Sequence, residues 1–403
     1  MHKCFFPNLF FKIRKAIMKM VMKMKVLLYT EGEKLFSKSG LGKAIKHQMR
    51  ALEYEGIEYT TNVKDDYDIV HINYYGPKSY ALAKKVHKKG KKVVYHAHST
   101  EEDFRNSFIF SKQIAPLFKK WIIKCYSLGD VIITPTPYSK RLLEGYGISK
   151  KIYAISNGIE LDKFKKEKEL RDQFRKEYNI KDDEKVIIGV GLYIERKGIL
   201  DFVELAKRLP EYKFIWFGYS PLSASPKKIR EAVTTKRDNL LFAGYVEQKK
   251  IVEAMNGCDL YLFPTLEETE GIPIIEACAC KTPSLIRDIP VFSEWLEDGV
   301  NTYKAKNIDE FVGSYDSVVT GEPYHRRKHH SGRNYSVDHR LEGYRVIKKI
   351  EKYSHSPVIE KRICKGDEKK HRPFVFRSRK PWCRRTRRVL PFANNPVGYK
   401  GSW

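Results

Sequence analysis

The sequence of 403 residues lacks several features that mark other classes of protein. No apolar run reaches the roughly 18 residues that a membrane-spanning helix needs. None of the seven cysteines belongs to a CxxC pair, and Cys278 and Cys280 have no second pair with which to hold a metal ion. Disulfides are rare in the cytosol and several of these cysteines lie in apolar runs, so the sequence favours a cytosolic, disulfide-free protein.

The first 24 residues lack acidic side chains altogether. They contain six Lys or Arg and no Asp or Glu, and lysines interrupt their apolar positions. No small-residue cleavage site follows, as it would in a signal peptide. Two interpretations stay open: a short amphipathic membrane anchor, or a true start at Met22 or Met24. The later start is favoured, and residues 1–24 are predicted to be a basic extension outside the fold.

The basic excess is concentrated at the two ends of the chain. Of the net charge of +28, residues 1–24 carry +6, residues 312–403 carry +15, and the body carries only +7. The tail also uses Arg more than Lys, 13 to 10, whereas the body has 38 Lys and 10 Arg. A helix is predicted near 336–353. The remainder of 312–403 is predicted to be either a disordered basic arm or a non-native C-terminus produced by a frame error, with the second favoured.

Short apolar runs alternate with helical patterns in two series. The first series is 25–30, 69–73, 92–96, 131–135 and 152–155; the second is 185–190, 213–218, 240–243, 260–263 and 284–286. Such alternation is typical of βαβ units in a doubly wound parallel sheet. The fold class is therefore α/β, with two Rossmann-like domains, 25–160 and 185–311, facing a central cleft. The charged stretch 161–184 is predicted to be a solvated linker that holds the hinge.

Two motifs in the second half place charged residues at strand-to-helix turns. In "GVGLYIERKG" (189–198), Arg196 and Lys197 follow a strand, where helix N–H groups and two cations would suit a diphosphate. In "FPTLEETEGIPIIEACACKTP" (263–283), Glu268 precedes Gly271 and Glu276 follows within an apolar helix. A buried glutamate needs strong hydrogen bonds, which ribose hydroxyls can provide. Each motif alone is equally compatible with an ordinary loop and helix start.

In combination these motifs resemble the GT-B glycosyltransferases of family 4. The order GVG…ERKG, FAGYV and E-x7-E resembles the second domain of that family, and "SNGIELDKF" (156–164) resembles its interdomain segment. "VVYHAHST" (93–100) is similar to its first-domain histidine strand end. The resemblance covers about residues 25–310. It implies an acceptor-binding first domain, a nucleotide-sugar-binding second domain, and sugar transfer with retained anomeric configuration.

The resemblance implies a role for each matched residue. Glu276 would bind the nucleotide ribose, Glu268 the donor-sugar hydroxyls, and Arg196 with Lys197 the leaving diphosphate. His98 would face the donor sugar, and the remaining donor-binding positions are Gly40, Gly42, Val246, Gly271 and Ile272. The predicted catalytic set is His98, Glu268, Arg196 and Lys197. No metal or other cofactor is expected. One departure is Leu192, which stands where the family usually has an arginine.

Within the family, the chain looks most like the Gram-positive diacylglycerol-glucose α-galactosyltransferases. "HAHSTEEDFRNSF" and "EETEGIPIIEACACKTPSLIRDIPVFSEWLEDGVN" carry this resemblance. It implies that UDP-galactose is the donor and a glucosyl-diacylglycerol the acceptor. Glucose transfer to give a diglucosyl lipid, or transfer to a polysaccharide precursor, stays open because no residue distinguishes the epimers.

A mixed apolar and basic stretch, 108–127, suits a surface that lies on an anionic membrane. The predicted membrane-binding residues are Lys112, Phe118, Lys119, Lys120, Trp121 and Lys124. The protein is accordingly predicted to be cytoplasmic, peripheral on the inner face of the cell membrane, and a monomer or weak dimer. A nucleic-acid partner is not expected, because no motif for one occurs and the basic excess lies outside the folded body.

Overall fold

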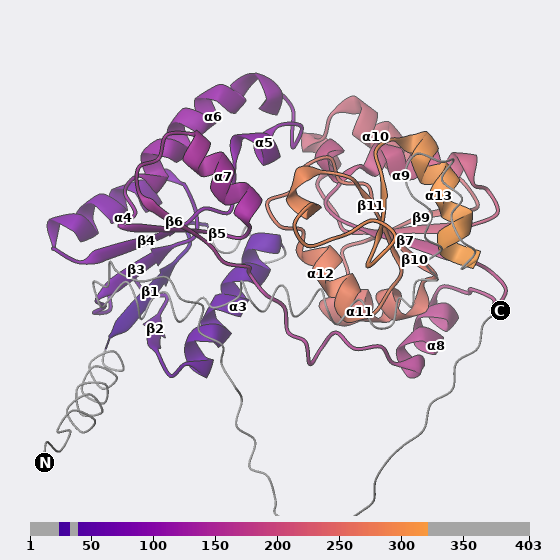
Figure 1. Ribbon diagram of the computed structural model, residues 1–403, viewed down its shortest axis with the longest axis horizontal. Helices are drawn as coiled ribbons and strands as arrows, with labels where there is room; N and C mark the ends of the chain where they lie inside the picture. The colour runs from indigo at the N-terminus through magenta and orange to yellow at the C-terminus, as the bar shows by residue number, and fades with distance from the viewer. Residues whose placement is uncertain (1–23, 33–38, 321–403) are drawn as a thin grey trace, which may run out of the picture. The chain divides into compact units, whose positions relative to one another are not determined.

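Two parallel β-sheets organise the residues that the computed structural model describes, 24–32 and 39–320 (Figure 1). All of these residues belong to one compact unit of the chain, 1–365. Residues 1–23 of the predicted N-terminal extension and the predicted tail helix near 336–353 lie outside the described residues. The predicted start of a separate tail at 312 is wrong, because the described helix that spans Ile308–Thr320 packs its Tyr315 into the core of the second half of the chain. The sheets confirm the predicted α/β class with two Rossmann-like domains, here called the first and second lobes.

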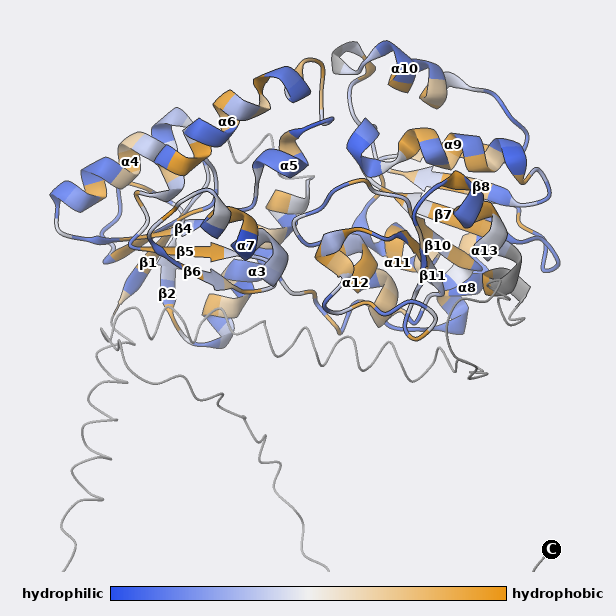
Figure 2. Ribbon diagram, turned by 45° about the horizontal axis from the view of Figure 1, so that its top comes forward, coloured by the Kyte–Doolittle hydropathy of each residue, from blue (hydrophilic) through white to orange (hydrophobic). Residues whose placement is uncertain are grey.

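The first lobe has a six-stranded sheet with the order β2-β1-β3-β4-β5-β6. Its strands are β1 (Lys25–Tyr29), β2 (Glu58–Thr60), β3 (Ile69–Ile72), β4 (Lys92–His96), β5 (Val131–Thr134) and β6 (Lys151–Ala154). Its helices are α3 (Gly40–Tyr54), α4 (Pro77–Lys88), α5 (Glu101–Phe104), α6 (Ser111–Tyr126) and α7 (Pro137–Gly145). Helices α4 and α6 lie on one face of the sheet and α3 on the other (Figures 1 and 2).

The second lobe repeats this architecture with the strand order β12-β11-β10-β7-β8-β9. Its strands are β7 (Val186–Val190), β8 (Lys213–Phe217), β9 (Leu240–Gly244), β10 (Leu260–Phe263), β11 (Ser284–Arg287) and β12 (Tyr303–Ala305). Its helices are α8 (Lys168–Glu177), α9 (Ile199–Arg208), α10 (Lys227–Thr234), α11 (Gln248–Gly257), α12 (Ile272–Ala279) and α13 (Ile308–Thr320), with 3₁₀ turns η1 (Glu195–Lys197), η2 (Leu222–Ala224) and η3 (Pro290–Phe292). Separate apolar cores cover the two faces of this sheet.

All ten predicted strands are present, because strands buried on both faces produce the continuous apolar runs that the sequence shows. The strands β2 and β12, of three residues each, were not predicted. They lie at sheet edges, where too few residues carry the pattern to be recognised.

The stretch 161–184 differs from its prediction as a solvated linker. It contains α8, whose Phe174 is 1% exposed and packs within the same apolar core as α11. Arg175, also buried, donates hydrogen bonds to the carbonyls of Gly257 and Glu184 at 3.2 and 2.6 Å. This helix is therefore part of the second lobe. Its buried face was not recognised in the sequence, because most of the residues around Phe174 and Arg175 are charged.

Candidate active site

The glutamate-rich loop of the second lobe follows β10 and leads into α12. Strands β10 and β7 are neighbours although they are not consecutive in the chain, so the strand order reverses between them. Ligands of open α/β sheets bind at the carboxyl ends of strands on either side of such a reversal. The loops that follow β7 and β10 carry the predicted cations and the predicted glutamates, respectively.

Each of these loops contains a glycine whose backbone and surroundings exclude a side chain. Gly271 has φ of 88°, and a Cβ there would lie 3.1 Å from the ring of Phe292 and 3.3 Å from that of Phe263. Gly198, after η1, has φ of 76°, and a Cβ would come 2.2 Å from the carbonyl oxygen of Pro264. Only glycine satisfies both requirements at either position.

Glu268 is buried between two cations from the neighbouring loop. Its Oε1 pairs with Lys197 Nζ, and its Oε2 lies 3.7 Å from Arg196 Nη1. Thr265 Oγ1 donates to Glu268 Oε1 at 3.1 Å. Although burial opposes ionisation, the charges of Lys197 and Arg196 hold the pKa of Glu268 below its usual value. Burial also lowers the pKa of Lys197. The folded chain thus brings together three of the predicted site residues, Glu268, Lys197 and Arg196, as ion pairs that the sequence analysis did not predict.

Arg196 has further contacts that hold its side chain in place. Its Nη1 donates to the carbonyl oxygen of Glu267 at 2.9 Å, and its Nε donates to Ser107 Oγ of the first lobe at 3.1 Å. Its backbone N–H donates to the Asn106 carbonyl at 3.1 Å. The guanidinium thus bridges the glutamate loop and the segment between α5 and α6.

Glu276 lies within α12 and is 0% exposed. Lys43 Nζ of α3 donates to its Oε1 at 2.8 Å, whereas its Oε2 makes no hydrogen bond of regular geometry. Burial raises the pKa of Glu276, while Lys43 and the nearby Gln248 side chain oppose this shift. A fully buried carboxylate with an uncommitted oxygen is a strong acceptor for hydroxyl donors.

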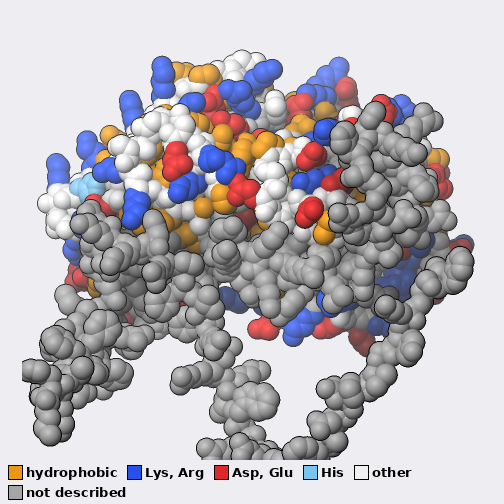
Figure 3. Space-filling model, in the orientation of Figure 1, with side chains coloured by type: hydrophobic (Ala, Val, Ile, Leu, Met, Phe, Trp, Pro, Cys, Tyr) orange, Lys and Arg blue, Asp and Glu red, His pale blue; other side chains and the backbone are white. Residues whose placement is uncertain are grey.

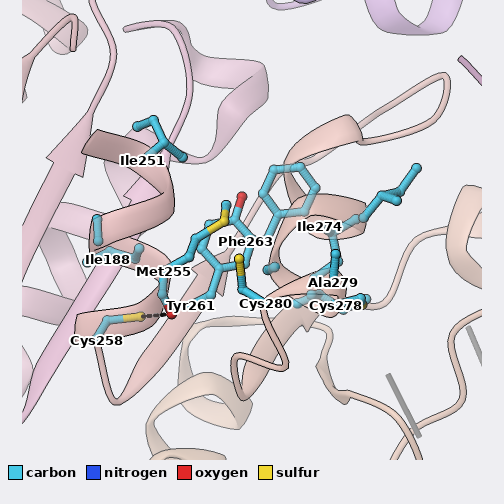
Figure 4. Packing of buried hydrophobic residues seen from close by; sticks show 14 of the residues in the cluster. Ile188, Ile251, Met255, Cys258, Tyr261, Phe263, Ile274, Cys278, Ala279 and Cys280 are labelled. Atoms are coloured by element: carbon cyan, nitrogen blue, oxygen red, sulfur yellow. Dashed lines mark hydrogen bonds between the residues drawn. The ribbon is translucent and has the colours of Figure 1, made fainter. Parts of the chain in front are cut away.

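The rest of α12 anchors Glu276. Figure 4 shows Ile274, Cys278 and Cys280 packed beside Tyr261 and Phe263 of β10, and all are part of one apolar core. Burial raises the pKa of the Cys278 and Cys280 thiols to about 12. These cysteines are packing residues of the helix that carries Glu276.

Glu270 is a buried carboxylate that was not predicted. Its Oε1 accepts from the backbone N–H of Asn157 at 3.1 Å, and its Oε2 accepts from Asn157 Nδ2 at 2.6 Å. Burial raises the pKa of Glu270 to about 7. Asn157 belongs to the "SNGIELDKF" segment, so Glu270 joins that segment to the glutamate loop.

His98 is part of a stack of imidazole rings in the first lobe. Its ring is 4.0 Å from that of His96, centroid to centroid, and the His96 ring is 5.4 Å from that of His71. His98 Nε2 lies 3.0 Å from Asn73 Oδ1, to which Gln48 Nε2 donates at 2.8 Å. Burial, followed by the effect of His71, lowers the pKa of His98 to about 3, and burial also lowers the pKa of His96, so the rings of His96 and His98 are neutral at physiological pH.

Comparison with known proteins assigns the chain to a family. A model of "Glycosyltransferase Family 4" matches residues 46–163, and one of "Glycosyl transferases group 1" matches residues 171–335. The processive diacylglycerol alpha-glucosyltransferase of Acholeplasma laidlawii is 46% identical over 299 residues, which cover 73% of this chain and 88% of that relative. The chain belongs to the family 4 glycosyltransferases.

This glycosyltransferase is also similar to more distant relatives, one found by sequence and one by structure. The alpha-galactosylglucosyldiacylglycerol synthase of Streptococcus pneumoniae is 24% identical over 333 residues, covering 79% of this chain and 88% of the relative. The solved structure of sucrose-phosphate synthase from Thermosynechococcus elongatus superposes with a TM-score of 0.67 at 13% identity, covering 86% of this chain and all of that chain. The structural likeness supports the GT-B fold.

The other predicted donor-binding positions of the glycosyltransferase lie on loops and helix starts. Gly40 and Gly42 form the first turn of α3, where Ser39 caps the helix by accepting from the Gly42 N–H at 3.4 Å. Val246 is half-buried between β9 and α11 and packs against the second-lobe core. Ile272 is the first residue of α12. In the described part of the chain, no three His, Cys, Asp or Glu side chains gather in a way that could hold a metal ion.

The predicted membrane-binding residues lie on different sides of α6. Phe118 is 9% exposed within the first-lobe core, and Trp121 Nε1 donates to the Tyr75 carbonyl at 2.7 Å. Lys119 lies 3.1 Å from Glu101 and above the Tyr146 ring. These three side chains face the protein. They lie on or beside the buried face of α6, whose positions recur at helical spacing.

The opposite side of α6 and the preceding loop are exposed and apolar. The exposed large side chains are Phe108, Ile109, Phe110, Ile114 and Leu117, and the exposed lysines beside them are Lys112, Lys120 and Lys124. We call the five apolar residues the apolar tip. None of the helices in the described ranges is long and apolar enough to cross a bilayer.

Sequence reasoning missed Lys43, Glu270 and the histidine partners Gln48 and Asn73. The only available signal for Asn73 was its place as the last residue of the predicted strand 69–73. Lys43 and Glu270 carried no such signal, since their partners Glu276 and Asn157 are 233 and 113 residues away in the chain.

Proposed function

We propose that this protein is a retaining hexosyltransferase that moves glucose from UDP-glucose to a diacylglycerol-based lipid at an anionic membrane surface. The observation that carries the proposal is a pair of buried glutamates, eight residues apart in the sequence, whose neighbouring groups differ. Glu268 is neutralised by Lys197 and Arg196, and Glu276 retains an oxygen without a regular hydrogen bond. This arrangement suits a donor that combines a sugar, a diphosphate and a ribose.

Each group has a chemical task in this proposal. The ribose hydroxyls donate to Glu276, and the donor-sugar hydroxyls donate to Glu268. Lys197 and Arg196 stabilise the negative charge that develops on the diphosphate as it leaves. The backbone of Gly271 and Ile272 approaches the sugar and phosphates, and Gly40, Gly42 and Val246 complete the donor site. His98, as a neutral imidazole, exchanges hydrogen bonds with sugar hydroxyls.

The transfer itself is proposed to occur by attack on the same face from which the diphosphate departs. The acceptor hydroxyl oxygen forms a bond to the anomeric carbon while the bond from that carbon to the diphosphate oxygen breaks. The acceptor proton passes to the departing phosphate oxygen, so no enzyme nucleophile is required. With two cations beside the diphosphate, catalysis is proposed to need no metal ion.

Similarity to named relatives favours glucose over galactose as the transferred sugar. The Acholeplasma laidlawii glucosyltransferase is 46% identical to this chain, whereas the Streptococcus pneumoniae galactosyl lipid synthase is 24% identical. The proposal therefore departs from the galactose expected from sequence motifs alone. Galactose transfer to a glucosyl-diacylglycerol is the second candidate, because the latter relative covers 79% of this chain.

The apolar tip and its lysines are the proposed membrane contact. Figure 3 shows Lys and Arg side chains beside hydrophobic ones along the edge where Figure 1 places α6. Exposed aromatic and aliphatic groups enter the headgroup region, and flanking lysines are attracted to anionic lipids. Such contact would place the protein as a peripheral monomer or weak dimer on the cytoplasmic face of the membrane.

A transfer assay tests the proposal directly. UDP-glucose and UDP-galactose are supplied separately with diacylglycerol or glucosyl-diacylglycerol in anionic vesicles, in buffer containing a metal chelator. We expect a glucosylated lipid with α linkage from UDP-glucose, identified by mass spectrometry and NMR. A product from UDP-galactose alone would replace the proposed donor. Transfer from neither nucleotide to either lipid would contradict the proposed acceptor.

A further inference from the structure

The six residues between α5 and α6 connect the contacts with Arg196 to the apolar tip. On one side, the backbone carbonyl of Asn106 and the hydroxyl of Ser107 accept hydrogen bonds from Arg196, each at 3.1 Å. On the other side, beginning with the next residue, Phe108, lies the apolar tip. One short stretch of backbone therefore joins the proposed membrane contact to the proposed leaving-group site.

Ser107 is held so that its oxygen faces Arg196. Its hydroxyl donates to the Asp103 carbonyl at 2.9 Å, which leaves its lone pairs to accept from Arg196 Nε. Its backbone N–H donates to Ser111 Oγ, the first residue of α6, at 3.2 Å. Since Asp103 lies in α5, Ser107 is tied to α5 and α6 as well as to Arg196.

Arg196 in turn holds the glutamate loop. The guanidinium that donates to Ser107 through Nε also donates to the Glu267 carbonyl at 2.9 Å through Nη1, which lies 3.7 Å from Glu268 Oε2. A guanidinium has donors in a fixed planar fork, so restraining its Nε end orients the end that meets the glutamate loop. Moving Ser107 would thus move the charge of Arg196 relative to the glutamate loop.

The backbone of this connection is unusual at two positions. Asn106 has φ of 59° and Phe110 has φ of 64°, both in the left-handed region. Asparagine enters that region readily, but a bulky aromatic residue does not, and its presence there requires support from surrounding contacts. Phe110 is nevertheless 69% exposed. Its contacts with a lipid surface would add the missing support and fix the conformation of the segment.

We propose that Ser107 is a positioning residue that holds Arg196 against the glutamate loop, and that lipid contact at the apolar tip promotes sugar transfer through it. This inference rests on the proposed function, because it concerns transfer to an acceptor in a membrane. Ser107 touches neither donor nor acceptor, and its effect passes through Arg196.

The test compares Ser107→Ala, Ser107→Thr and the wild type in the full chain. Turnover is measured with glucosyl-diacylglycerol in phosphatidylcholine–phosphatidylglycerol vesicles and with a short-chain soluble analogue of the same lipid. For Ser107→Ala we expect kcat on vesicles to fall about tenfold, as for the loss of a hydrogen bond to a charged group, with a smaller fall on the soluble analogue. Ser107→Thr restores the hydroxyl and should recover the ratio of the two rates.

Two controls separate positioning from membrane contact and from damage to the fold. Sedimentation with acceptor-free vesicles should be unchanged in Ser107→Ala, whereas weakened sedimentation would make Ser107 part of the membrane contact and overturn the proposal. Ser127→Ala, at the other end of α6, should behave as the wild type. In an Arg196→Ala background, Ser107→Ala should cause no further loss, because residues that act as a unit are not additive.

The remaining outcomes are also decisive. An equal fall on vesicles and on the soluble analogue, or no fall on either, would overturn the coupling between lipid contact and the donor site. If the wild type transfers no sugar to any lipid, the proposed function fails. The affinity of the Ser107 variants for UDP then tests the positioning role of Ser107 by itself. Weaker UDP binding in Ser107→Ala that Ser107→Thr restores would retain its positioning role, and unchanged binding would contradict it.

Discussion

The two lobes share a parallel-sheet architecture but prepare their polar groups in opposite ways. In the second lobe, Glu268 is kept ionised by Lys197 and Arg196, so charge is buried together with its compensation. In the first lobe, His98 stacks on His96, and burial followed by the effect of His71 lowers the pKa of His98 so that its ring is neutral at physiological pH. At these two positions, the second lobe buries a charge together with its counter-charges, and the first lobe buries a polar group that carries no charge.

The difference matches the two halves of a transfer reaction. A departing diphosphate gains negative charge, which preorganised cations stabilise most effectively away from water. The hydroxyl groups of a sugar carry no charge and are recognised by groups that can both donate and accept, such as a neutral imidazole or an amide.

Removing the charge of Glu268 should abolish most of the activity. Glu268→Gln keeps the shape but leaves Lys197 and Arg196 buried without an anion, so we expect kcat to fall about 10³-fold. The unpaired cations should also lower the free energy of unfolding by about 3 kcal/mol without ligand. UDP should recover part of this loss, since its diphosphate supplies the missing charge. Transfer kinetics and urea unfolding with and without UDP measure both effects. Normal turnover would contradict the role of Glu268.

Glu276→Gln should weaken nucleotide binding rather than turnover at saturation. The ribose hydroxyls lose hydrogen bonds to a charged acceptor, so we expect the dissociation constant of UDP to rise about 30-fold. Isothermal titration calorimetry with UDP and with uracil alone provides the measurement. Uracil, which has no ribose, serves as the control and should bind both proteins equally. Unchanged UDP affinity would remove Glu276 from the site.

Glu270 should make the stability of the protein depend on pH. Its pKa in the folded chain, about 7, is raised above the ordinary 4.5, so its contribution to stability is complete below that ordinary value and disappears as the pH rises through 7. Between pH 5 and pH 8 the wild type should lose about 2 kcal/mol of unfolding free energy relative to Glu270→Gln. Urea unfolding of both proteins at the two pH values measures this difference. Parallel pH dependences would contradict the assignment.

Substitutions in the apolar tip should weaken membrane binding without changing the affinity for UDP measured in the absence of lipid. Phe110→Ser or Leu117→Ser, at 69% and 67% exposure, should each weaken binding to anionic vesicles about tenfold, as expected for about 1.4 kcal/mol of apolar contact. Lys119→Gln is the matched control, because this lysine faces Glu101 and should contribute little. Sedimentation gives the vesicle affinity, and UDP titration should give the same constant for all variants. If Lys119→Gln lost as much vesicle affinity as the apolar-tip variants, the membrane contact would not be at the apolar tip.

Much of the fold was predictable because its signals are local. Strands buried on both faces leave uninterrupted apolar runs, and all ten predicted runs became strands of the two sheets. The approach of Lys197 to Glu268 could also have been predicted, because both residues follow neighbouring parallel strands whose carboxyl ends lie at the same edge of the sheet. The edge strands β2 and β12 and the buried face of α8 were missed, because each is too short or too charged for its pattern to stand out.

The two-lobed α/β architecture, the glycine turns and the family can be read from the sequence alone, because these depend on periodicity and on motifs within a few tens of residues. The tertiary structure was needed to show which charges meet. Lys43 reaches Glu276, Glu270 reaches Asn157 and Ser107 reaches Arg196 across 233, 113 and 89 residues of chain. It also decided which side of α6 faces outward, turning Trp121 to the core and Leu117 to solvent. The physical reason is that a side chain's charge state and exposure depend on the groups packed around it, and those groups come from distant parts of the chain.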